Sequence, residues 1–245
     1  MAEQIAYDEF LCIDQYDISG VSANFGSERT ADLKEFVCFP DPTITSASPP
    51  YKKRLSGPES AKLSVAGYLD TAVNLAAANA ALNASPIITY GIGRALGSQV
   101  QLYVAKESGF QHGGQVGEVI PISMEIASDG VIVAGALFEF GAKTATGNGT
   151  SRTVTAVTTG KSRYLHVHVI SVSGTGTPTL TVIYETSAVG DYTDAVTRHT
   201  FTDFTAAGVQ RAVKTAAVSD TNGRFRWTIS GTNPSFLVRM SEGVR

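Results

Sequence analysis

Hydrophobic and polar residues alternate with period two along most of the second half of the chain, and turn residues at 174–178 and 220–223 separate the alternating stretches. This pattern predicts antiparallel strands with one buried and one solvated face. Six or seven such strands predict an antiparallel β-sandwich, Ig-like or similar to a carbohydrate-binding module. The side chains expected on the buried faces are Leu165, Val167 and Val169; Leu180, Val182 and Tyr184; Phe225, Trp227 and Ile229; and Phe236, Val238 and Met240.

The first half also reads as strand, with one exception. Residues 70–86 are rich in alanine, begin with Asp70 and end at Pro86. This predicts one helix, capped by Asp70 and packed on the sheet through Val73, Leu75 and Leu82. The fold class expected is therefore mainly β: an N-terminal sandwich or barrel with one flanking helix, followed by the C-terminal sandwich.

Residues 118–126 and 131–140 alternate on either side of the turn signal Ser128-Asp129-Gly130. The spacing predicts a β-hairpin over residues 118–140. Its second strand is apolar on both faces, so we expect another subunit to cover it, with the contact made by Ile132, Val133, Leu137 and Phe138.

The composition changes near Lys143, where residues 144–151 are small or polar. These features predict a first domain over 1–143, a linker over 144–151 and a second domain over 152–245. Residues 1–146 hold nine Lys and Arg against sixteen Asp and Glu, a net charge of −7, and the remainder holds ten against six, a net charge of +4. The total of −3 argues against general nucleic-acid binding through phosphate neutralisation.

Five of the nine prolines fall within residues 40–58. Because proline cannot donate to a sheet ladder, this segment is predicted to be an extended arm outside the core. We expect it to cross to an adjacent subunit or ring through Tyr51, Lys52, Lys53 and Arg54, with the cations meeting acidic residues of the first domain. An ordinary exposed loop is the alternative.

Cys12 and Cys38 do not form a disulfide framework, and we expect both thiols to be reduced in a protein that folds in the cytoplasm. The first ten residues lack the pattern of a secretory signal, and polar residues interrupt the uncharged stretch 71–93. The sequence therefore predicts neither secretion through a cleaved signal nor membrane insertion.

Residues with catalytic or metal-binding chemistry are few. His166 and His168 could share a zinc ion, but the alternation places them on the solvated face of their strand without a third ligand nearby. His112 lies in a glycine-rich loop, and no Gly-x-Ser-x-Gly motif accompanies it. We expect no enzyme activity, no metal and no cofactor.

The second half resembles the C-terminal region of tail tube (major tail) proteins of long-tailed bacteriophages. The likeness covers about 115 residues and is one of pattern rather than of a catalytic signature. The first half is similar more loosely, through 56–60 (SGPES) and the strand and helix that follow. The segments that carry the resemblance in the second half are 129–135 (DGVIVAG), 143–152, 165–174 (LHVHVISVSG), 179–184 (TLTVIY), 201–204 with 208–211, and 224–231 (RFRWTISG).

The resemblance implies a virion protein that is made in the host cytoplasm and self-assembles into hexameric rings, which stack into a tail tube. Tape measure and tail terminator proteins are its implied partners, and DNA passes through the tube without specific binding. An acidic lumen in the −7 domain would repel phosphates and let the DNA slide. The alternative function is a virion-attached sandwich module that binds carbohydrate or a cell surface.

Overall fold

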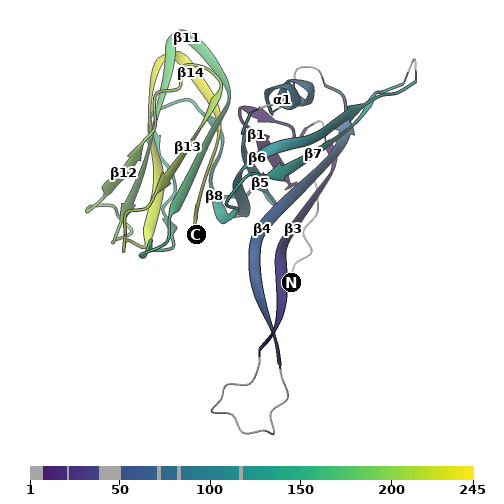
Figure 1. Cartoon of the computed structure of the whole chain (residues 1–245). Helices are drawn as coiled ribbons and strands as arrows, with labels where there is room; N and C mark the ends of the chain where they lie inside the picture. The colour runs from purple at the N-terminus through teal and green to yellow at the C-terminus, as the bar shows by residue number, and fades with distance from the viewer. Residues whose placement is uncertain (1–7, 21, 39–50, 71–72, 82–83, 116–117) are drawn as a thin grey trace, which may run out of the picture.

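The computed structural model describes residues 8–20, 22–38, 51–70, 73–81, 84–115 and 118–245. The chain is mainly β with one short helix, which confirms the expected fold class (Figure 1). The elements are β1 (Phe10–Ile13), β2 (Tyr16–Asp17), β3 (Ser22–Cys38), β4 (Tyr51–Tyr68), α1 (Asn74–Ala81), β5 (Ile87–Gly91), β6 (Gln99–His112), β7 (Pro121–Ser128), β8 (Val133–Lys143), β9 (Gly147–Asn148), β10 (Arg152–Thr153), β11 (Arg163–Ser187), β12 (Val196–Thr200), β13 (Gly208–Lys214) and β14 (Asn222–Val244).

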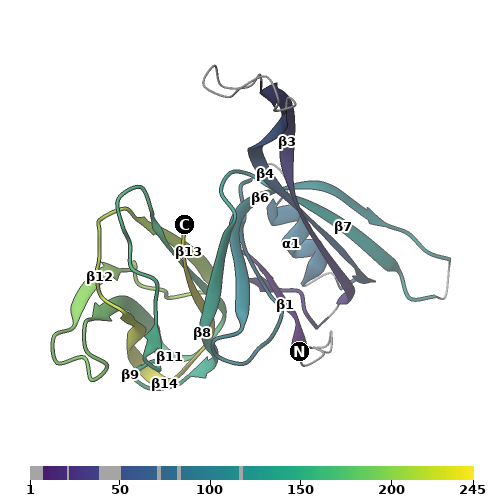
Figure 2. The same cartoon turned by 90° about the horizontal axis from the view of Figure 1, so that it is seen from below.

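Two antiparallel sheets share β6. Sheet A has the order β12-β11-β14-β8-β6-β5-β1-β2, and sheet B consists of β3, β4, β7 and the outer half of β6. The inner half of β6 pairs with β5 and β8, whereas residues 105–112 pair with β7. Figure 2 shows β6 and β8 running between the two lobes of the molecule.

The first lobe has its core between the two sheets. Leu63 and Val65 of β4 alternate with exposed residues and pack against Tyr90 and Tyr103 of sheet A. The helix joins this core through Ala77 and Ala78. Small alanine side chains let the helix approach closely, which explains how an eight-residue helix is held by packing rather than by its own propensity.

The predicted helix and its cap are confirmed over Asn74–Ala81. The Asp70 carboxylate accepts a hydrogen bond from the Val73 amide at 3.1 Å, and the Asn74 side chain accepts one from the Asp70 amide at 3.0 Å. These reciprocal bonds satisfy donors that a helix start leaves unpaired. Val73 packs on the core as expected, while Leu82 lies outside the described residues.

The second lobe is a two-layer sandwich built largely from one folded strand pair. β11 and β14 pair along nearly their whole lengths, and both bend so that their two halves face each other (Figure 1). The four predicted apolar rows meet in this core, although Ile229 is only partly buried.

The segment at 174–178 is a corner within this strand pair rather than a turn between separate strands. Gly174 has φ +121°, and across the pair Gly231 has φ +108°. A Cβ at either position would lie 2.9 Å from opposing backbone or proline atoms. The bend therefore needs glycine at both sites.

The predicted hairpin over residues 118–140 is wrong. β7 pairs with β4 and β6 in sheet B, whereas β8 pairs with β6 and β14 in sheet A. Gly130, with φ +96°, turns the chain from one sheet into the other. Alternation fixes which faces are buried, but it does not specify whether the two strands pair with each other.

The segment predicted as a linker follows the edge of β14. β9 pairs with Arg226 and Trp227, and the Trp227 indole donates to the Ala145 carbonyl at 2.9 Å. Sheet A also joins the two sides of the predicted boundary at 143, because β8, which ends at Lys143, pairs with β14 over eight positions. The division into domains 1–143 and 152–245 stays a prediction, but sheet A joins the two parts.

Among the residues that the structure describes, no helix has the length and hydrophobicity needed to span a bilayer.

Candidate assembly surfaces

Sheet B has an unpaired strand edge on each side. Among the described residues, β3 pairs only with β4, and residues 107–112 of β6 pair only with β7. Unpaired N–H and C=O groups along a strand edge are templates for pairing with another chain. The two edges lie on opposite sides of the sheet, so a second copy can pair with each of them.

β3 and β4 continue beyond sheet B as a two-stranded ribbon. β7 pairs with β4 only from Lys62 to Tyr68, so the rest of β4 pairs with β3 alone. Figure 1 shows the two strands extending below the body of the molecule. Two strands without further partners are marginally stable in water, so cover from another molecule would stabilise this ribbon.

The arm predicted over residues 40–58 is partly wrong, because residues 51–58 belong to β4. Tyr51, Lys52, Lys53 and Arg54 pair with Cys38, Val37, Phe36 and Glu35 of β3. The register shifts between Ala31 and Leu33, and Pro58 falls opposite this irregularity, where the ladder does not need its missing N–H. Residues 39–50 lie outside the described residues. The contact of this segment with another subunit stays a proposal.

The outer face of sheet B carries small and polar side chains. Ser64 and Ser123, with Gly26 and Gly109, line a shallow groove across its four strands. Lys62 Nζ and Glu125 Oε1 form an ion pair at 2.9 Å, and both side chains are half exposed. Glu28 lies directly opposite Lys62. This face therefore mixes charges, and the −7 excess of the first half is not concentrated on it.

The four residues predicted to contact a neighbour through the hairpin are core residues. Ile132, Val133, Leu137 and Phe138 are each at most 1% exposed within their own chain. Phe138 packs edge-on against Phe225 of β14, with ring centroids 5.6 Å apart. Since these side chains are already covered, they cannot form the surface that another subunit would bind, and their predicted role is corrected.

His166 and His168 are fully buried, so the prediction of a solvated face is wrong. Sheet A curls until β1 and β5 cover this face of β11. The Thr89 hydroxyl lies 3.1 Å from His166 Nδ1 and 2.8 Å from His168 Nε2, and His168 Nδ1 lies 2.5 Å from the Asp14 carbonyl. Among the described residues no three His, Cys, Asp or Glu side chains cluster to hold a metal ion.

The hydrogen bonds of this cluster have one consistent direction. Since the Asp14 carbonyl can only accept, His168 Nδ1 donates to it, and Nε2 of the neutral ring then accepts from Thr89. The Thr89 oxygen in turn accepts from His166 Nδ1. Both imidazoles are neutral in this arrangement, which connects the two lobes.

Burial explains why these rings stay neutral. Desolvation lowers the pKa of His168 to about 4, with the Asp14 hydrogen bond and Asp17 opposing the shift and Arg239 adding to it. Desolvation also lowers the pKa of His166 well below its ordinary value, reinforced by His168 and Arg211. Placing a positive charge in this interior is costly, so protonation of either ring destabilises the folded junction.

Arg239 anchors the same junction. Its guanidinium forms an ion pair with Asp17 at 2.9 Å and lies 3.5 Å from the centre of the Phe140 ring. In the second lobe, Arg163 pairs with Glu242 at 2.9 Å, and both side chains are buried. Burial raises the pKa of Glu242 to about 7, although Arg163 acts in the opposite direction.

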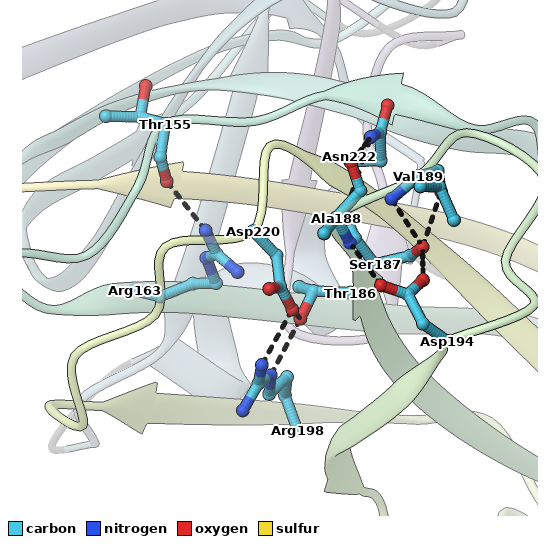
Figure 3. Close-up of polar contacts among 10 residues, drawn as sticks. All are labelled: Thr155, Arg163, Thr186, Ser187, Ala188, Val189, Asp194, Arg198, Asp220 and Asn222. Carbon is cyan, nitrogen blue, oxygen red and sulfur yellow. Dashed lines mark hydrogen bonds and ion pairs between the residues drawn. The ribbon is translucent and has the colours of Figure 1, made fainter.

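Polar side chains at one end of the sandwich bind neighbouring loops (Figure 3). Asp220 accepts hydrogen bonds from Thr186 at 2.6 Å and Arg198 at 2.7 Å, and these bonds lower its pKa. Ser187 donates to Asp194, whose carboxylate also accepts from the Ala188 amide at 3.2 Å. These bonds are made within the lobe, so they serve to hold its loops.

Comparisons with known proteins give distant structural similarity. No family model and no curated protein matches the chain. A chain in the virion of a native gene transfer agent particle is 16% identical, with a TM-score of 0.43, over 53% of this chain and 97% of that one. A chain in the tail of an empty gene transfer agent particle, refined helically with C6 symmetry, is 14% identical, with a TM-score of 0.42 over the same shares.

The third similar structure is the SPP1 Dit protein, described as a paradigm of the hub adsorption apparatus in phages that infect Gram-positive bacteria. It is 8% identical, with a TM-score of 0.33, over 96% of this chain and 98% of that one. The chain is thus distantly similar to components of phages and of phage-like particles. Because the similarity is this distant, the function proposed below rests on the geometry of sheet B.

Proposed function

We propose that the chain is a structural subunit of a phage-like tail, and that its copies assemble into rings that stack into a tube for DNA. The observation that carries this proposal is the pair of open edges of sheet B. β3 of one copy can pair with the outer half of β6 of the next. Such a head-to-tail contact generates a closed ring when the rotation between copies closes.

Six copies per ring is the number that the sequence resemblance to tail tube proteins implies. The same resemblance supplies the tape measure and tail terminator proteins as proposed partners and the virion tail as the location. The chain would act without catalysis or cofactor, through contacts with its own copies.

We further propose that the outer face of sheet B lines the conduit, because the opposite face is the core of the first lobe. Tight binding of DNA requires Lys and Arg side chains that neutralise phosphates. On this face the Lys62 charge is already paired with Glu125, and small polar residues surround the pair. A surface of this kind neither holds nor strongly repels the duplex, which suits passage of DNA.

Electron microscopy of the purified chain, with and without a nucleating tail fraction, tests the proposal. Rings or tubes are the expected result, and deletion of residues 44–51 should stop tube growth while the monomer remains folded. Deletion of the exposed turn 205–207 is the matched control and should leave assembly unchanged. Particles that stay monodisperse and bind on a glycan array would instead favour the carbohydrate-binding alternative.

A further inference from the structure

An exposed apolar patch lies at one end of sheet B. Tyr68, Val119 and Ile120 are 57%, 67% and 37% exposed, and Pro121 beside them is exposed as well. Tyr68 pairs with Pro121, and the Leu69 amide donates to the Ile120 carbonyl at 2.8 Å, so the four residues are contiguous. We call Tyr68, Val119, Ile120 and Pro121 the tip patch. Contiguous exposed apolar side chains of this kind mark an interaction surface.

The tip patch and the ribbon lie at opposite ends of the same strands. At the patch end, Ser22 pairs with Gly67, and at the other end, Cys38 pairs with Tyr51. The 18 residues of β4 separate these ends by roughly 55 Å at the usual rise per residue. The ribbon therefore cannot fold back onto the patch of its own chain. A second copy displaced along the strand axis would bring its ribbon to the patch.

The charges of the two ends are complementary. The ribbon segments 32–38 and 51–58 contain Lys34, Lys52, Lys53 and Arg54 against two carboxylates, a net charge of +2. Two hollows flank the patch, and Asp70 is the only Lys, Arg, Asp or Glu among the residues that line them. Glu118, next to the patch in sequence, is exposed. A ribbon with a net positive charge would therefore bring its charge near two carboxylates, those of Asp70, which also caps α1, and Glu118.

We propose that the tip patch is the docking surface for the β3–β4 ribbon of a second copy, in the neighbouring ring. This inference rests on the proposed function and names the surface that receives the ribbon when rings stack. The contact joins different surfaces of the two copies, so repetition produces an open stack instead of a closed pair. It also provides the cover that an isolated two-stranded ribbon needs.

Substitution of the patch separates stacking from ring formation. The double variant Val119→Ser/Ile120→Ser should form rings but raise the critical concentration for tubes on the order of tenfold, because two apolar side chains lose their cover. The control Val131→Ser/Val196→Ser changes two valines of similar exposure elsewhere and should form tubes like the unchanged chain. Sedimentation measures the critical concentrations, and electron microscopy shows whether the particles are rings or tubes.

The outcomes distinguish the two proposals. Rings without tubes support the tip patch as the stacking surface. Tubes at the original critical concentration would overturn it and leave the ring proposal standing. If the unchanged chain forms neither rings nor tubes, the proposed function fails. Cross-linking then tests the contact between the ribbon and the tip patch independently.

Cross-linking uses Cys38, the last residue of β3, with a cysteine placed in the patch. In concentrated protein, a short bismaleimide should join Val119→Cys chains into multimers, and the additional change Cys38→Ser should abolish them. Val131→Cys is the matched control. Multimers no more abundant than in that control would overturn the docking surface whether or not tubes form.

Discussion

The C-terminal sandwich and sheet B differ in the length of the strands at their edges. In the sandwich, the long strands β11 and β14 have partners on both sides, and the strands left at its margins, β12 and β13, have only five and seven residues. In sheet B, the 17-residue β3 is itself an edge. Short edge strands limit unwanted pairing, whereas a long open edge invites it. The sandwich leaves only short strands at its margins, whereas sheet B leaves a long edge, which is where the proposed assembly would add another copy.

The largest effect should come from the core of the sandwich. Phe138→Ala should lower the free energy of unfolding by about 4 kcal/mol, because it leaves a cavity beside Phe225 and Tyr184. Urea denaturation of the unassembled chain measures it. Val131→Ala, at a side chain that is 43% exposed, is the control and should change stability by less than about 0.5 kcal/mol. A small loss for Phe138→Ala would contradict the close packing of this side chain in the core of its own chain.

Acid should weaken the junction between the lobes. The folded-state pKa of His168, about 4, lies below its ordinary value of 6.5, so the unfolded chain binds the proton more tightly. The stability that neutral His168 contributes is present above pH 6.5 and falls by about 3 kcal/mol as the pH approaches 4.

The change His168→Gln should remove that part of the pH dependence, while His112→Gln, at an exposed position, should not. Glu242 titrates in the opposite direction, since its raised pKa removes stability as the pH rises toward 7. The measurement is therefore the difference between the His168→Gln variant and the unchanged chain, in urea at pH 7, 5.5 and 4.5. If the free energies of unfolding of the two chains fall in parallel as the pH is lowered, His168 is not the source of this pH dependence.

Alternation in the sequence predicted the sandwich rows, because each row depends only on neighbouring positions of one strand. It did not reveal that β7 and β8 belong to different sheets, since pairing depends on residues far apart in the chain. His166 and His168 were misplaced for the same reason: β1 and β5, more than 70 residues away, cover their face.

The sequence also did not identify which strands form the open edges of sheet B. An unpaired edge is a property of the assembled sheet, and nothing in the composition of β3 distinguishes it from a central strand. The prolines of residues 40–58 predicted an arm outside the sheets, whereas Tyr51–Pro58 belongs to β4, with Pro58 opposite a shift in register. One signal that could have found the tip patch was Val119-Ile120-Pro121, an apolar run beside the glycines of residues 113–117.

A smaller loss of stability is expected when a glycine is replaced by alanine, and it should differ between the two regions. Gly135 of β8 faces Gly243 of β14, and a Cβ at Gly243 would lie 2.7 Å from the Ala134 carbonyl. Gly135→Ala would place its methyl against the Glu242 carbonyl, so β8 and β14 would have to move apart, at about 2 kcal/mol of stability. Gly26→Ala in sheet B meets only Ser64 at 3.8 Å and should be tolerated. Thermal unfolding compares the two, and equal losses would contradict the difference in packing.

The smallest effect should come from the outer face of sheet B. Glu125→Gln breaks the ion pair with Lys62, but both side chains are half exposed, so water and salt already screen the attraction. The free energy of unfolding of the monomer should therefore change by no more than about 0.5 kcal/mol, and 0.5 M salt should reduce the difference further. Denaturation at two salt concentrations measures this, with Glu59→Gln as a second site for comparison, where a less exposed carboxylate pairs with both Arg29 and Arg245. A loss of several kcal/mol for Glu125→Gln would mean that this face is already covered in solution, and sheet B would then be no more open than the sandwich.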